Sequence, residues 1–323
     1  MPRVSVVVIS KDEPPLSVTL AVLREQCVDV DAECVVVDAS MGRLGRVRDD
    51  HPWVRWHDYV GPADRLVTIP HQRNVGVEVA KGDVIAFCDA GGVPASSWLS
   101  NLTAPILEGN TSATAGPISS RRRCAYGTLN DLPTGAVVRR VVTCNFAFSR
   151  ALFHRVGGFD ERFDYGSDSE FGWRIEEAGE QVVSVSDAVV TIDWGSRRRQ
   201  LKRDLRYGEA KVRQFLLCPA QRRRILQESP EVFVYPLLFL TLPLAVIAAL
   251  VAERPALVVP WALGCAILLA RDLWCRRPLG SMLDHVVVSI GIGNELARAS
   301  LVRLRQGVGE RVLPNWSDGE LQP

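Results

Sequence analysis

Polar side chains follow three apolar runs in the N-terminal part of the chain. Ser10 and Asp12 come directly after the first run, Asp38 ends the second, and Asp89 follows the third. Open α/β sheets bind their ligands at the carboxyl ends of the strands, where such side chains meet. Hydroxyl and carboxylate oxygens in this place can hydrogen-bond a base or a ribose, so the pattern predicts a nucleotide-binding edge. The alternative for Ser10 and Asp12 is that they cap the following helix.

The elements that position these side chains are predicted by hydrophobic periodicity. Short runs rich in β-branched residues are typical of strands buried on both faces of a parallel sheet, and segments of helical spacing separate them. The sequence therefore predicts an α/β fold with a mostly parallel, Rossmann-like sheet. Strands are expected at residues 4–9, 33–38, 84–88, 144–148, 182–185 and 189–192, helices at 16–26, 72–80, 94–107, 150–156 and 168–178, and loops over 118–140.

The last third of the chain is far more hydrophobic than the rest. Residues 232–252 contain no charge and have the length of a bilayer span, with a buried core helix as the alternative. A second run, 256–270, is short for a span, and a re-entrant or interfacial segment is its alternative. Residues 286–302 fit an amphipathic helix that lies on the membrane.

Arginines flank this hydrophobic pair. Triplets stand at 197–199 and 222–224 and more arginines at 271, 276 and 277, whereas the intervening turn carries only Arg254. The positive-inside rule then places both ends in the cytosol. We expect two domains, 1–218 and 219–323, with the first on the cytoplasmic side of the cell membrane.

Composition sets further bounds. The formal net charge of the 323 residues is +1, which does not favour a nucleic-acid binder, and no secretory signal opens the chain. The eight cysteines form no CxxC pair, and four of them lie in apolar runs. They are interpreted as reduced packing residues, which favours a reducing compartment for this part of the chain.

Four stretches, in order, resemble the family-2 glycosyltransferases of the GT-A fold, in particular membrane-associated bacterial members. They read VSVVVISKDE at 4–13, VVVDAS at 35–40, HQRNVG followed by AKGDVIAFCD within 71–89, and GGFDERF with SD and WR within 157–174. The resemblance covers residues 4–218. It implies an inverting glycosyltransferase that uses a nucleotide-sugar donor.

The resemblance also implies roles for individual residues on the donor side. Asp38 would read the nucleobase, while Arg73 and Asn74 would border the nucleotide pocket together with Ser10, Asp12 and Asp89. A structural ion pair is the alternative for Arg73. A solvated surface is the alternative for the arginines at 121–123.

On the acceptor side the family carries an acidic pair, of which Asp168 is retained after Ser167. An aspartate carboxylate can accept the proton of an attacking hydroxyl, so Asp168 is the predicted general base. A helix-terminal carboxylate is the alternative. The residues expected to line the acceptor are Asn145, Trp173 and Arg174. The alternative for Asn145 is a strand amide bonded to the backbone, and the alternative for Trp173 is a core side chain.

The metal position departs from the family pattern. Where the family has Asp-x-Asp, this chain has Asp89-Ala90-Gly91, so Gly91 replaces one ligand. A hard cation can be held by one or two carboxylates with phosphates and waters. We therefore expect a divalent metal, Mg²⁺ or Mn²⁺, that is weakly bound or dispensable, with Asp193 or the arginines at 121–123 as other sources of ligand or charge.

Two functions follow from this sequence. The first is transfer of a sugar to a hydroxyl of a lipid-linked or membrane-proximal glycan acceptor, as in the making of cell envelope polysaccharide. The second is a pseudo-glycosyltransferase that serves as a binding or scaffold subunit of a partner enzyme. The retained Asp168 favours the first, and Gly91 favours the second. An oligomer is compatible with either function.

Overall fold

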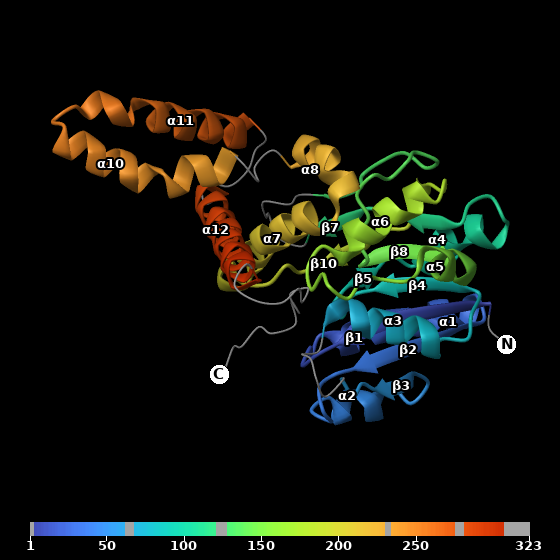
Figure 1. The fold of residues 1–323 in the computed structure, drawn as a ribbon. Coiled ribbons are helices and arrows are strands. Elements are labelled where there is room, and N and C mark those ends of the chain that lie inside the picture. Colours follow the sequence, from blue (N-terminus) through green and yellow to red (C-terminus); the bar gives the residue numbers. More distant parts are fainter. Residues whose placement is uncertain (1–2, 62–67, 121–127, 230–233, 275–280, 307–323) are drawn as a thin grey trace. The chain divides into compact units, whose positions relative to one another are not determined.

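The computed structural model describes residues 3–61, 68–120, 128–229, 234–274 and 281–306. They form two compact units, the first ending at Asp193 and the second beginning at Trp194 (Figure 1). The division lies before the predicted boundary at 218 because helix α7 (Arg197–Leu217) packs along the C-terminal helix α12 (Ser281–Gln306).

The first unit contains a seven-stranded sheet of order β3-β2-β1-β4-β8-β6-β9. Pairing is parallel except around β8, which is antiparallel to both β4 and β6. The strands are β1 (Val4–Ser10), β2 (Ala32–Asp38), β3 (Arg55–Asp58), β4 (Val84–Cys88), β6 (Ala113–Ala115), β8 (Asn145–Ser149) and β9 (Val182–Ser184). The predicted α/β class with a mostly parallel sheet is confirmed.

A second, three-stranded sheet has the order β5-β10-β7. Its strands are β5 (Val93–Pro94), β10 (Val190–Ile192) and β7 (Ile118–Ser120). β7 falls in the stretch that the sequence assigned to loops, and a strand of three residues carries too little periodicity to be recognised. Residues 121–127 of that stretch lie outside the described residues.

Helices cover both faces of the large sheet, which explains why its central strands are apolar throughout. Val4, Val6 and Val8 of β1 pack into the core that holds α1 and α4, while Val7 packs into the core that holds α3, α5 and α6. The helices are α1 (Leu16–Asp29), α2 (Gly45–Asp50), α3 (Ile69–Val79), α4 (Trp98–Leu107), α5 (Arg150–Val156) and α6 (Ser167–Glu177). All except α2 were expected from the sequence.

Four cysteines of the first unit, Cys27, Cys34, Cys88 and Cys144, are buried and unpaired. Burial raises the pKa of each of these thiols. Such thiols behave as small apolar groups, as the sequence predicts.

The second unit is helical (Figure 1). After α7 come η1 (Pro219–Gln221), α8 (Arg222–Glu228), η2 (Pro236–Leu240), α10 (Leu242–Val251), η3 (Pro255–Val258), α11 (Val259–Trp274) and α12. The segments η2–α10 and η3–α11 run as an antiparallel hairpin, drawn in orange in Figure 1.

One described helical stretch, Pro255–Trp274, is long and apolar enough to cross a membrane, and only 11% of its apolar window is buried. The preceding stretch, Pro236–Val251, is shorter. The sequence favoured residues 232–252 as the span, of which residues 232 and 233 lie outside the described residues, so that span stays a prediction. A π-helical turn with Pro236 at its start and a second proline, Pro243, break the regular helix there.

Helix α12 packs along α7 and buries part of its polar side there. Its Glu295 is fully buried and ion-paired with Arg213 of α7, 2.8 Å between Oε1 and Nε. Gly208 and Gly291 allow the two helices to touch, because a Cβ on either glycine would lie about 2 Å from a carbonyl oxygen of the other helix. Asn294 and Arg298 of the same helix are exposed, and the expectation that residues 286–302 lie on the membrane stays a prediction.

Candidate functional site

The loops after β1 and β2 are joined to each other at the carboxyl edge of the sheet. Ser10 lies beside Asp38 in the parallel register. The backbone N–H of Ser40 donates to Asp38 Oδ1 over 2.9 Å, and that of Asp12 donates to Ser40 Oγ over 2.8 Å. Asp38 and Ser10 are buried, and the Ser10 hydroxyl is without a hydrogen-bond partner. A buried hydroxyl without a protein partner is uncommon, and this one is free to bind a water or a ligand.

Asp12 stands at the exposed end of these loops. Its φ of +57° lies in the left-handed region, which aspartate adopts more readily than most non-glycine residues. Arg43 donates to both carboxylate oxygens, and this hydrogen bonding holds the pKa of Asp12 below its usual range. Helix α1 has Pro15 as its N-cap residue and no side-chain cap, so neither Ser10 nor Asp12 caps it.

Arg73 and Asp89 form the centre of the site. Arg73, from α3, is buried, and its Nη2 lies 4.0 Å from Oδ1 of Asp89, which follows β4. Its guanidinium also lies over the ring of Phe159, 5.7 Å from the centroid, and its buried Nε is unpartnered. A buried cation with an unused donor next to a half-exposed carboxylate suits an anionic ligand.

The pKa of Asp89 is raised. Desolvation by the surrounding protein is the main cause, although the Asp89 side chain is itself 48% accessible. The negative charge of Asp168 raises this pKa further, while Arg73 opposes the rise. The structure thus brings three of the predicted residues, from α3, the end of β4 and the start of α6, into one electrostatic neighbourhood.

Asp168 occupies the first turn of α6, after Gly166, whose φ of +81° makes the sharp entry. Its Oδ1 accepts from the backbone N–H of Ser169 over 2.9 Å. Within the described part of the chain Oδ2 accepts no hydrogen bond, so it is the oxygen available to take a proton.

Three predicted residues contribute their side chains to the scaffold. Asn145 is completely buried: its Oδ1 accepts from Trp98 Nε1, and its Nδ2 donates to the carbonyls of Pro117 and Ala188. Every polar atom of its amide is therefore occupied by protein. The predicted acceptor role of Asn145 is replaced by a structural one, close to the strand-amide alternative.

Trp173 and Arg174 lie on α6. Trp173 is 6% exposed and is a core side chain. Arg174 pairs with Glu170, 2.6 Å between Nε and Oε1, and donates to the carbonyl of Gly158 over 2.6 Å. The burial of Trp173 agrees with the core-tryptophan alternative, and these contacts bind the guanidinium of Arg174 to the protein; an acceptor role for either residue stays a prediction.

Asn74 also contacts the protein, but it does so at the border of the site. Its Nδ2 donates to the carbonyl of Phe159 and to Glu161, and its Oδ1 accepts from the N–H of Phe159 over 2.8 Å. Its neighbour Arg73 contacts the same turn through the Phe159 ring. The sequence signal for this arrangement was the GGFDE stretch, whose contacts could not be assigned without the fold.

The loop expected to bind a metal is tightly held. Gly91 has a φ of +87°, and its N–H donates to Thr19 Oγ1 over 2.8 Å. Among the described residues no group of three His, Cys, Asp or Glu side chains could hold a metal ion. Asp89 can supply one carboxylate, so a cation would have to take its other ligands from phosphates and water. The arginines at 121–123, named as an alternative, lie outside the described residues.

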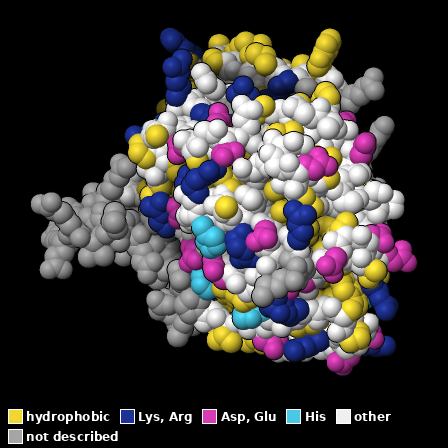
Figure 2. Space-filling view, turned by 90° about the vertical axis from the view of Figure 1, so that its right-hand side faces the viewer, with side chains coloured by type: hydrophobic (Ala, Val, Ile, Leu, Met, Phe, Trp, Pro, Cys, Tyr) yellow, Lys and Arg dark blue, Asp and Glu magenta, His cyan; other side chains and the backbone are white. Residues whose placement is uncertain are grey.

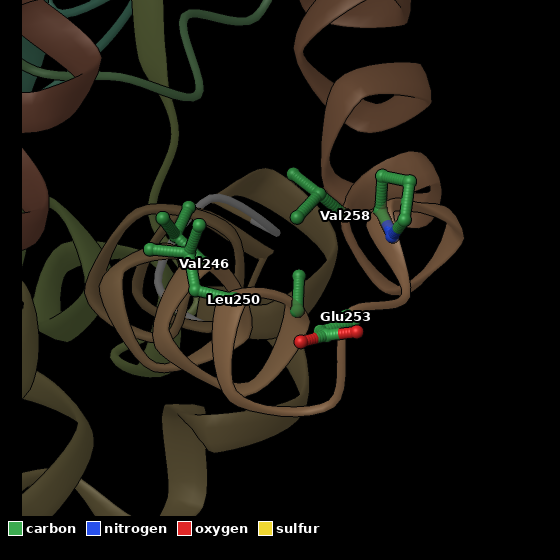
Figure 3. A pocket seen from close by; sticks show the side chains of 6 residues that line it. Val246, Leu250, Glu253 and Val258 are labelled. Atoms are coloured by element: carbon green, nitrogen blue, oxygen red, sulfur yellow. The ribbon is translucent and has the colours of Figure 1, made fainter.

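A cavity of about 470 Å³ lies in the second unit, at the turn between α10 and η3. It is lined by Val246, Ala249, Leu250, Glu253, Pro255 and Val258 (Figure 3). Only Glu253 is charged, and none of the predicted site residues lines it.

Charged side chains of both signs occur on the face drawn in Figure 2. On the face of Figure 2, basic and acidic side chains are interspersed, and no single sign dominates. The pattern agrees with the near-zero net charge and gives no support to nucleic-acid binding.

No protein-family model matches the chain. Two curated relatives are similar to part of it. Chondroitin synthase of Pasteurella multocida (strain Pm70) is 26% identical over 209 residues, 51% of this chain and 22% of the relative. The pre-mycofactocin glycosyltransferase of Mycobacterium tuberculosis is 28% identical over 152 residues, 42% of this chain and 32% of the relative. The chain thus spans a third or less of the length of these relatives.

Solved structures share the fold. The mannosyltransferase PcManGT from Pyrobaculum calidifontis, in complex with GDP-Man and Mn²⁺, superposes with a TM-score of 0.65 at 21% identity, covering 91% of this chain and 87% of that one. TarS of S. aureus superposes with a TM-score of 0.52 at 17% identity, covering 71% and 43%.

Proposed function

We propose that this chain, which is a family-2 glycosyltransferase of the GT-A fold, transfers a sugar from a nucleotide-sugar donor to an acceptor hydroxyl with inversion at the anomeric carbon. The observation that carries the proposal is the grouping of Arg73, Asp89 and Asp168 at the carboxyl edge of β4. Open α/β sheets bind ligands at this edge.

The donor is assigned to the loops after β1 and β2. The buried Asp38 and the unpartnered Ser10 hydroxyl offer an acceptor and a donor to a base or ribose. Arg73 offers its Nε and its positive charge to the diphosphate. A charge-assisted hydrogen bond of this kind is about twice as strong as a neutral one.

The chemical step needs a base and an oriented acceptor. Asp168 accepts the hydroxyl proton of the acceptor as the oxygen attacks the anomeric carbon. The bond from that carbon to the diphosphate oxygen breaks, and the electron pair leaves with the nucleoside diphosphate. Attack from the side opposite the leaving group inverts the configuration, and correct positioning supplies much of the rate.

A divalent cation, when bound, would neutralise the diphosphate as it leaves. The residues present fit a weakly held cation, because Asp89 is the carboxylate that remains in the motif and Arg73 already supplies positive charge next to it. The mannosyltransferase that shares the fold was solved with Mn²⁺.

We place the protein on the cell membrane, with the first unit on the cytoplasmic side and a lipid-linked or membrane-proximal acceptor. Support comes from the apolar stretch Pro255–Trp274, from the largely exposed apolar side chains of α10, and from the arginines on both sides of the hairpin. The acceptor would then meet the site at the membrane surface.

The second candidate remains a pseudo-glycosyltransferase that binds nucleotide but transfers no sugar. Gly91 in the metal loop favours it, and the retained Asp168 opposes it.

Nucleotide sugars are first screened by thermal shift, since a ligand that binds only the folded protein stabilises it. Donor consumption is then measured with the best ligand, with and without Mn²⁺. Binding without consumption in both conditions would support the scaffold function.

A further inference from the structure

The turn at residues 157–161, here called the Phe159 turn, connects two parts of the site. It begins with Gly157 and Gly158, whose φ angles of +82° and +71° are both in the left-handed region. The turn ends α5, and α6 begins a few residues later with Asp168. Side chains from two helices bind the backbone of this turn, Asn74 from α3 and Arg174 from α6.

Arg174 holds the turn through its whole guanidinium. Nη1 donates to the carbonyl of Val156, and Nη2 donates to that of Gly158 over 2.6 Å. Nε and Nη2 also donate to the two carboxylate oxygens of Glu170, at 2.6 and 2.7 Å. Because Glu170 and Asp168 share the first turn of α6, the contact fixes the helix start that carries the base.

The Glu170–Arg174 pair is shielded from water. The side chains are 8% and 24% exposed, and burial raises the pKa of Glu170 while Arg174 opposes the rise. Buried ion pairs often contribute little net stability, whereas the removal of one partner leaves an uncompensated buried charge. The two hydrogen bonds between Glu170 and Arg174 fix the geometry of the pair.

Asn74 holds the turn from the donor side. Its amide both donates to and accepts from the backbone of Phe159. The Phe159 ring packs against Phe171 of α6 at 4.4 Å between centroids, and the guanidinium of Arg73 lies over it. Phe87, Phe148 and Phe153 complete its surroundings. One turn therefore contacts the arginine expected to bind the diphosphate and the helix that carries Asp168.

We propose that Asn74 and Arg174 are positioning residues, which act through the Phe159 turn to fix the carboxylate of Asp168 relative to Arg73 and Asp89. The proposal rests on the proposed function. It differs from the acceptor role that the sequence suggested for Arg174, because here Arg174 touches no substrate. A displacement of about 1 Å in a reacting group can cost about a hundredfold in rate.

The test replaces Arg174 in the full-length protein by lysine. Lysine keeps the charge beside Glu170 but cannot bridge the carboxylate and two carbonyls together. The matched control is Arg155→Lys, which alters the ion pair between Arg155 on α5 and Glu180, a residue that follows α6. Steady-state kinetics, nucleoside-diphosphate affinity by calorimetry and Tm are measured for both variants.

Arg174→Lys is expected to lower kcat about ten- to a hundredfold, with the affinity for the nucleoside diphosphate within about threefold of wild type. The control is expected to leave kcat within twofold. A kcat of Arg174→Lys within twofold of wild type would overturn the proposal. So would a loss of nucleotide affinity as large as the loss of kcat/KM, because Arg174 would then contact the donor.

A second measurement separates this proposal from the proposed function. Crystal structures of wild type and Arg174→Lys should show the Asp168 carboxylate displaced relative to Arg73 in the variant. An unmoved carboxylate overturns the positioning role even if the enzyme is active. If the wild type consumes no donor in the panel, but Asp168 is displaced in the Arg174→Lys structure, the proposed function is contradicted and the positioning role is not.

Discussion

The Nη2 atom of Arg73 lies 4.0 Å from Oδ1 of Asp89, with the arginine buried and the carboxylate at the mouth of the site. Asp89 is the first residue of the family's Asp-x-Asp motif, and Gly91 takes the place of the second aspartate. A fixed positive charge therefore adjoins the one carboxylate that this loop retains. This relationship determines both the stability and the ion-binding behaviour expected of the site.

Asp89→Asn is predicted to stabilise the protein at neutral pH. The folded-state pKa of Asp89 is raised, so folding favours its protonated form. Its contribution to stability is present below the unfolded pKa of about 3.9 and is lost as pH rises through the folded pKa. The Tm gain of the variant should be seen at pH 7 and vanish near pH 3. A Tm that falls at pH 7 would show that the charged form is the stabilised one.

Gly91→Asp, which restores the second acidic residue of the motif, is predicted to destabilise the protein and not to create a good metal site. The φ of +87° is strained for any side chain, and a Cβ would lie 3.1 Å from Cβ of Pro15. Gly109→Asp is the control, because its φ is +76° but no atom lies within 4 Å of its Cβ position. The Tm should fall more for Gly91→Asp. An equal fall in Tm for the two variants would show that the contact with Pro15 does not destabilise Gly91→Asp.

Divalent-ion dependence is predicted to be weak. With one loop carboxylate, half-saturation by Mn²⁺ in the presence of the nucleoside diphosphate should lie in the millimolar range, as an order of magnitude for sites poor in carboxylates. Calorimetry measures it, and Asp89→Asn should weaken it further. Micromolar binding that Asp89→Asn leaves intact would place the ion elsewhere.

The full-length protein is predicted to require detergent for extraction from membranes. Leu263 and Ile267 of α11 are 59% and 68% exposed, and these apolar surfaces have lower free energy in lipid than in water. Leu263→Lys combined with Ile267→Lys should shift the protein toward the fraction extracted by carbonate. Complete extraction of the wild type by carbonate would contradict a spanning hairpin.

The hairpin is better tested in this way than by truncation after Gln227. That truncation removes α12 and leaves the α7 side chain of Arg213 without Glu295. It also exposes the surface around Gly208 that α12 covers. We expect such a fragment to be less stable, so its insolubility would say nothing about the membrane.

Periodicity was sufficient for the central strands and for most helices, because long apolar runs such as β1 leave little choice of structure. It was insufficient for β7, whose three residues owe their strand conformation to β10. Among site residues, Asp38, Arg73 and Asp89 could be placed at the edge of the sheet from strand ends and resemblance. The burial of Asn145 and Arg174 depends on contacts with residues far away in the sequence, and neither composition nor spacing contains them.

Sugar transfer by wild type and by Asp168→Asn, measured with the donor that gives the largest thermal shift, tests the central claim most directly. The amide is nearly isosteric with the carboxylate but does not act as a base at neutral pH. The account predicts a loss of about 10²–10⁴-fold in kcat, with nucleoside-diphosphate affinity nearly unchanged. Transfer by Asp168→Asn within threefold of wild type would contradict it.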